Sequence, residues 1–237
     1  YLLRERLGRF GAVATSFLIL ISPTLLYFSR FIRNDIHMAV WEVGLAICMW
    51  KYLASRKTLY LYITAAILSL SFTTMETTFI TVVIFGSFLF LMLFWELLEW
   101  LSEGRRQTPT RSAAGIRGMW GEVAGWARSD SASGLIALFV VYFTLSLPQG
   151  GALLGLVQRW LGVTLVSPAE NWVAAPVGAP LGAGVYIAAA AVFVLLAISA
   201  AIGRMWNWRV WLGCAAIFYV IYFLLFTTLF TNFTGFG

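Results

Sequence analysis

The chain has 237 residues, of which 61% are hydrophobic and 11% are Asp, Glu, Lys or Arg. Soluble domains carry about 25% charged residues, so this composition and the mean hydropathy of +0.86 exclude an ordinary soluble domain and indicate an integral membrane protein. The net charge of +6 does not indicate nucleic acid, because the basic residues are spread over short segments between apolar runs. Cys48 and Cys214 lie inside apolar runs, which excludes a disulfide framework and a cysteine metal cluster.

We expect an all-α, polytopic membrane protein, because the apolar runs lack strict alternation and have about the length that a transmembrane helix needs. Their order predicts about seven transmembrane helices, at about residues 10–28, 38–53, 58–72, 79–101, 135–147, 184–202 and 210–230. The run from 58 to 101 is divided at SFTTMETTF (71–79). Its Ser and Thr compete for backbone hydrogen bonds, and Glu76 would otherwise lie near the middle of the bilayer.

Polar segments group these helices into modules. The predicted parts are a four-helix membrane module (1–101), a cytoplasmic polar loop (102–134) and a three-helix membrane module (135–237). Four apolar residues at helical spacing in the polar loop predict a short interfacial helix: Ile116, Trp120, Val123 and Trp126. A second interfacial helix is expected over 152–162, inside the long Pro- and Gly-containing connection 148–183.

The basic residues predict how the chain crosses the membrane. All lysines and arginines except Arg30, Arg33 and Arg159 fall in loops on the side of the N-terminus. Because cytoplasmic loops carry the excess of Lys and Arg, we expect a plasma-membrane protein with a cytoplasmic N-terminus. The outer side then receives Arg30, Arg33, Glu76 and the connection 148–183.

Four charged or titratable residues lie between the first two predicted spans: Arg30, Arg33, Asp35 and His37. We call them the charge knot. Charge this close to a bilayer is costly and usually serves ligands, ions or protons. Arg30 and Arg33 are three residues apart, so on a helix they would form a fork for a phosphate at headgroup level. The alternatives are that they contact lipid phosphates or pair with Asp35.

Three carboxylates and one histidine are candidates for chemistry at this place. Asp35 could be a general base, a metal ligand or the counter-ion of the arginines, and a divalent cation stays open because oxygen-rich sites usually need more carboxylates. His37 is a substrate contact, a proton carrier or a polar interfacial residue. Glu42 is expected either to pair with an arginine of the charge knot or to contact substrate, and Glu76, flanked by threonines, is expected to contact a ligand.

The segment SPTLLYFSRFIRNDIHM resembles membrane glycosyltransferases of the GT-C superfamily, of the glycosyltransferase family 39 or protein O-mannosyltransferase-like type. The resemblance is to the prokaryotic flippase-activity-associated subgroup, on three ordered matches: SRFIRND (29–35), METTF (75–79) and FTNFTG (230–235). It implies an enzyme that transfers a sugar from a polyprenyl-phosphate donor to an acceptor at the outer face. By the same resemblance Arg30 and Arg33 would hold the donor phosphate, Asp35 would orient the acceptor or a cation, and Glu76 would line the pocket.

The sequence departs from that family in two respects. Met75 stands where we expect a lysine, which removes a phosphate contact. The acidic outer loop with the catalytic carboxylate of GT-C enzymes would precede Tyr1, so we expect a piece of a longer protein. The alternative to an enzyme is a non-catalytic, structural or accessory subunit of a larger membrane complex, which would bind lipid or partner subunits through its aromatic surface. A transporter is disfavoured because the sequence has no inverted repeat.

Overall fold

A computed structural model of the chain describes residues 4–23, 35–107, 130–153 and 183–226. These residues form helices joined by short turns, with no strand among them. The elements are α1 (Arg4–Ile21), α3 (Asp35–Ser55), α4 (Leu59–Thr74), α5 (Thr78–Gln107), α7 (Asp130–Ser146), the 3₁₀ helix η2 (Leu147–Leu153) and α9 (Ala183–Phe226). The all-α prediction is therefore confirmed for the described part of the chain.

Several of these helices have the length and composition of membrane spans. Within the described ranges, three segments are long and apolar enough to cross a bilayer: Thr78–Trp100, Ala132–Gly151 and Gly184–Phe226. Leu7–Ile21 and Leu59–Thr74 are apolar but shorter. The structure is consistent with the predicted membrane protein, and the count of seven spans stays a prediction.

Two helix ends lie farther out than the sequence predicts. α5 continues to Gln107 and α7 begins at Asp130, so helix occupies both margins of the predicted polar loop 102–134. Glu, Arg and Gln are good helix formers, which explains how α5 extends through SEGRRQ after its apolar run ends. Both predicted interfacial helices, within the polar loop and over 152–162, lie outside the described residues.

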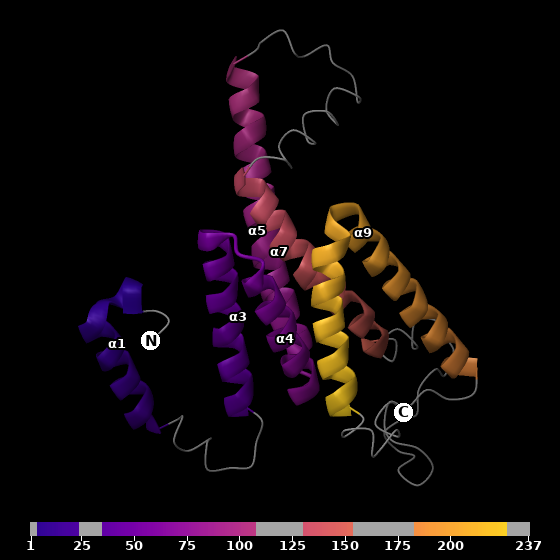
Figure 1. Ribbon diagram of the computed structural model, residues 1–237, viewed down its shortest axis with the longest axis horizontal. Coiled ribbons are helices and arrows are strands. Elements are labelled where there is room, and N and C mark those ends of the chain that lie inside the picture. The colour runs from indigo at the N-terminus through magenta and orange to yellow at the C-terminus, as the bar shows by residue number, and fades with distance from the viewer. Residues whose placement is uncertain (1–3, 24–34, 108–129, 154–182, 227–237) are drawn as a thin grey trace.

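α9 has two arms that meet at Asn207 (Figure 1). We call residues 183–206 the first arm and residues 208–226 the second arm. Asn207 has an extended backbone, with φ of −156° and ψ of 97°. Its side-chain oxygen accepts a hydrogen bond from the backbone N–H of Val210 at 3.4 Å, which is how Asn caps the start of a helix. The last two predicted helices correspond to these arms, and residues 203–209 between them are helical except at Asn207.

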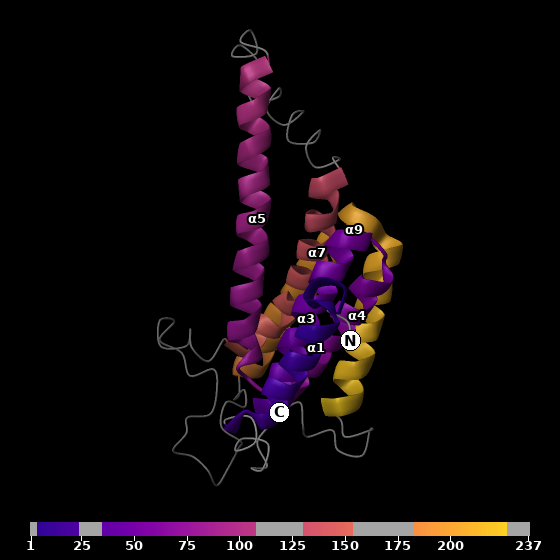
Figure 2. The same cartoon turned by 90° about the vertical axis from the view of Figure 1, so that its left-hand side faces the viewer.

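α4 lies in the middle of the helix bundle. It packs against α3 on one side and α9 on the other, while α7 packs against both α5 and α9 (Figure 1). Figure 2 shows that α5 extends well past the neighbouring helices. The start of α3, the turn between α4 and α5, the end of α7 and both ends of α9 lie at one end of the molecule, the lower end in Figure 1.

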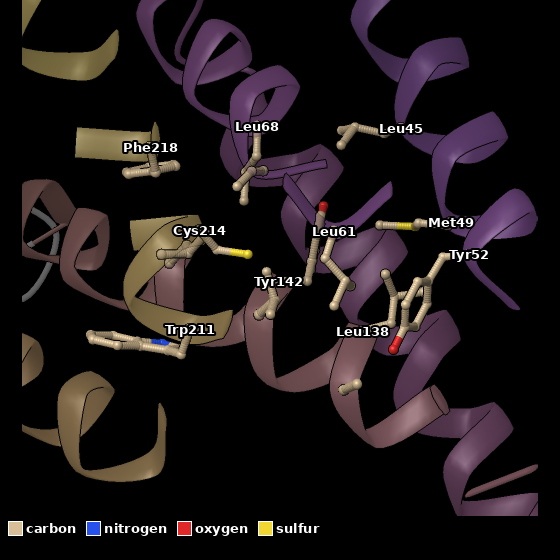
Figure 3. Packing of buried hydrophobic residues seen from close by; sticks show 14 of the residues in the cluster. Leu45, Met49, Tyr52, Leu61, Leu68, Leu138, Tyr142, Trp211, Cys214 and Phe218 are labelled. Carbon is tan, nitrogen blue, oxygen red and sulfur yellow. The ribbon is translucent and has the colours of Figure 1, made fainter. Parts of the chain in front are cut away.

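The core forms where α3, α4, α7 and the second arm of α9 meet (Figure 3). Many large side chains there are completely buried, among them Leu45, Leu61, Leu138, Tyr142 and Phe218. Lipid tails are as apolar as these side chains, so in a membrane such contacts stabilise through close packing more than through exclusion of water. The stability of this core therefore depends on how closely the facing side chains fit together.

Hydrogen bonds from small polar side chains join the helices of the core. Ser69 Oγ on α4 donates to the backbone oxygen of Phe218 at 2.8 Å. Ser199 Oγ, in the first arm of α9, donates to the backbone oxygen of Thr144 at 2.5 Å. Trp211 Nε1, in the second arm, donates to Thr144 Oγ1 at 2.9 Å. Thr144 on α7 thus binds both arms of α9.

Gly203 is the point of closest approach between the two arms. A Cβ atom on Gly203 would lie 2.3 Å from the ring of Trp211. That ring is 6% exposed and is held by its bond to Thr144, so it has little freedom to move away. Only glycine fits here without displacing the indole.

We expect Gly203→Ala to destabilise the protein by about 1–3 kcal/mol, because the new methyl group overpacks the contact with Trp211. Thermal unfolding in detergent micelles measures the change. Gly86→Ala on α5 is the matched control, since its Cβ would meet Tyr142 at 4.0 Å, an ordinary contact. Equal stability of the two variants would contradict the assigned packing.

Candidate functional site

The candidate site lies where α3 begins, beside the turn between α4 and α5 (Figure 1). Thr78 Oγ1 lies 3.8 Å from Met38 Sδ. Trp41 Nε1 donates a hydrogen bond to Thr74 Oγ1 at 3.2 Å. These two contacts hold the first turns of α3 against the turn that contains Glu76.

Threonine and serine groups close the turn that contains Glu76. Met75 is extended, with φ of −160° and ψ of 148°, and ends α4. Thr78 Oγ1 lies 2.7 Å from the backbone oxygen of Ser71 and 2.8 Å from that of Met75. Thr74 Oγ1 donates to the backbone oxygen of Leu70 at 2.6 Å. The predicted break at 71–79 is confirmed, and these hydroxyls are used within the turn itself.

Glu42 links α3 to α5. Its Oε1 accepts a hydrogen bond from Thr81 Oγ1 at 2.7 Å, and the contact is partly buried. The hydroxyl of Tyr142 on α7 donates to the backbone oxygen of Thr81 at 3.4 Å. Pairing of Glu42 with an arginine of the charge knot or with a substrate stays a prediction, and among the described residues its partner is a threonine on a neighbouring helix. Thr81 is 39 residues away in the chain, and local spacing could not identify it.

The other candidate residues lie at the same end of the bundle or outside the described residues. Asp35 is the first residue of α3. His37 and Glu76 have exposed side chains, so both are accessible to a ligand. Arg30 and Arg33 lie outside the described residues, and their roles stay predictions.

The described residues provide a limited set of metal ligands. Among them, no group of three His, Cys, Asp or Glu side chains lies close enough together to hold a metal ion. A divalent cation at the start of α3 would therefore need backbone oxygens, water or a substrate phosphate as further ligands.

Glu96 is a buried carboxylate that we did not single out in the sequence. It lies inside the span Thr78–Trp100 on α5. Its Oε2 is buried and has no hydrogen-bond partner among the described residues. The sequence did contain a signal for Glu96, because an acidic residue inside an apolar span is energetically costly and therefore marks a candidate functional residue.

A double-mutant cycle tests the bond between Glu42 and Thr81. We expect Glu42→Leu and Thr81→Val to show a coupling free energy of about 0.6 kcal/mol, and up to about 1.7 kcal/mol, the range found for hydrogen bonds between membrane helices. Thermal unfolding of the two single variants and the double variant measures it. Glu42→Gln is the control, because its amide oxygen still accepts the bond. Strictly additive costs would show that the bond contributes nothing.

The chain matches no family model, no curated protein and no solved structure. The assignment of a function therefore depends on the residues of the site and on the resemblance in the charge knot.

Proposed function

We propose that this chain is the membrane core of a glycosyltransferase of the GT-C type, which transfers a sugar from a polyprenyl-phosphate donor at the outer face of the plasma membrane. One observation supports this proposal most. The segment SRFIRND (29–35) runs directly into α3 at Asp35, and the first turns of α3 contact the turn that holds METTF (75–79), through Met38 with Thr78 and Trp41 with Thr74.

Each candidate residue has a role in this proposal. Arg30 and Arg33 hold the donor phosphate, since a pair of guanidinium groups matches its charge and geometry. The bond between the anomeric carbon and the phosphate oxygen breaks, and polyprenyl phosphate leaves with its negative charge held by the arginines. The acceptor hydroxyl forms the new bond to the anomeric carbon and gives its proton to Asp35. Exposed Glu76 and His37 contact the sugar or the acceptor.

Glu42 has a partner within the described part of the protein. Its carboxylate is engaged by Thr81, so we assign it to positioning: it holds α3 and α5 together beneath the site. This hydrogen bond joins two side chains of the protein, so it forms without a substrate.

A second candidate function is an accessory subunit of a membrane complex. Thr78, Thr81 and Leu89 are the buried residues of the segment Thr78–Trp100 on α5. Large apolar side chains such as Phe88, Leu91 and Trp95 are exposed. That face of α5 could contact a partner subunit. Purification of a stable complex, together with the absence of sugar transfer, would favour this function over the enzyme.

We expect Asp35→Asn and Arg33→Ala each to abolish sugar transfer, because the first removes the proton acceptor and the second half of the phosphate fork. Transfer of radiolabelled sugar from polyprenyl-phosphate donors by membranes containing the protein measures this, with circular dichroism as the test of folding. Glu99→Gln is the matched control, since Glu99 lies near the opposite end of α5 and Gln keeps the acceptor for Trp95 Nε1. Unchanged turnover in both site variants would refute the proposed site.

A further inference from the structure

The second arm of α9 has an open apolar groove along one face. The groove has a volume of about 620 Å³ and is lined by residues between Trp211 and Leu224. At 1.5 Å per residue this is a length of about 20 Å. Two small residues, Ala215 and Ala216, lie along the groove beside the larger Tyr219. Among the described residues, those that line the groove all belong to the second arm.

Two exposed arginines lie at the end of the groove that is nearest the bend. Arg209 precedes Leu212 and Ala216 by three and seven residues, so it shares their helical face. Arg204 directly follows Gly203, which lies against the ring of Trp211 at the start of the groove. One end of an apolar groove is therefore cationic.

Tryptophan side chains surround the same end. Trp208 is 41% exposed, and its ring stacks on that of Trp211 with centroids 5.5 Å apart. Trp206 is partly buried in the bend between the arms. Tryptophan is enriched at the level of the lipid headgroups. This places the two arginines at the membrane interface and the groove in the hydrocarbon region below them.

We propose that this face of α9 binds an anionic phospholipid, with the phosphate between Arg204 and Arg209 and one acyl chain along the groove. Guanidinium groups bind phosphate with two parallel hydrogen bonds. An acyl chain extends through half of the hydrocarbon core, about 15 Å, which fits within the groove.

The two arginines favour a phospholipid over a transmembrane helix of a second copy as the occupant of the groove. A transmembrane helix of a second copy could cover the apolar part of the groove. The described part of the chain has no carboxylate in α9, so a second copy of α9 brings no anionic group to Arg204 and Arg209. A phospholipid satisfies both the groove and the arginines. This inference does not depend on the proposed glycosyl transfer.

Native mass spectrometry of the full chain tests the site, with the protein released from nanodiscs of equal parts dioleoyl phosphatidylglycerol and dioleoyl phosphatidylcholine. We expect the wild-type chain to retain phosphatidylglycerol over phosphatidylcholine by about tenfold or more, since two arginines attract the anionic lipid. The double variant Arg204→Gln/Arg209→Gln should lose this preference. Ala216→Trp should lower retention of phosphatidylglycerol by filling the groove while both arginines remain.

Lys51→Gln is the matched control. It removes a positive charge from α3, which α4 separates from α9 (Figure 1), and it should leave the preference unchanged. Equal retention of the two lipids by the wild-type chain, or an unchanged preference in the double arginine variant, would overturn the proposal. A lipid-free dimer that Ala216→Trp dissociates would also overturn it. Because Arg204 and Arg209 are exposed, the double variant decides the question even if Ala216→Trp does not fold.

Discussion

A polar group inside a bilayer has no water to replace a missing hydrogen bond, so its partner must come from the protein. The helices of this chain are joined by such pairs. Ser69 binds a carbonyl of α9, Thr144 receives hydrogen bonds from both arms of α9, and Glu42 receives one from Thr81. Each pair fixes the rotation of one helix about its axis relative to its neighbour. Apolar side chains alone do not fix it, because they contact lipid tails as favourably as they contact another helix. The positions of the candidate residues follow from these few bonds.

The need to satisfy polar groups within the protein also determines the structure at the end of the bundle that holds the proposed site. The hydroxyls of Thr74 and Thr78 donate to the backbone oxygens of Leu70 and Ser71, so these two groups stabilise the end of α4 and are not free to bind a ligand. Glu76 itself remains exposed at the tip. A ligand that approaches this end would therefore meet the side chains of His37 and Glu76 above a rigid base formed by Trp41, Thr74 and Thr78.

Local properties of the sequence predicted the features that depend on local physics. Apolar runs identified the helices, and the cluster of Ser and Thr at 71–79 identified the break between α4 and α5. The extension of α5 to Gln107 was missed because the residues after Trp100 are polar, although most of them favour helix. The partner of Glu42 was missed because it is set by how α3 and α5 rotate against each other. Loop charge and spacing alone led to Arg30 and Arg33, which lie outside the described residues.

α5 has 30 residues, a rod of about 45 Å, whereas the hydrocarbon core of a bilayer is about 30 Å thick. Its apolar span ends at Trp100, a residue type that anchors at the interface. With Trp100 at the interface, the remaining turns to Gln107 would extend about 10 Å into the aqueous phase. Because α5 is a single continuous helix, a tilt of its apolar span within the membrane would move its polar end sideways across the membrane surface.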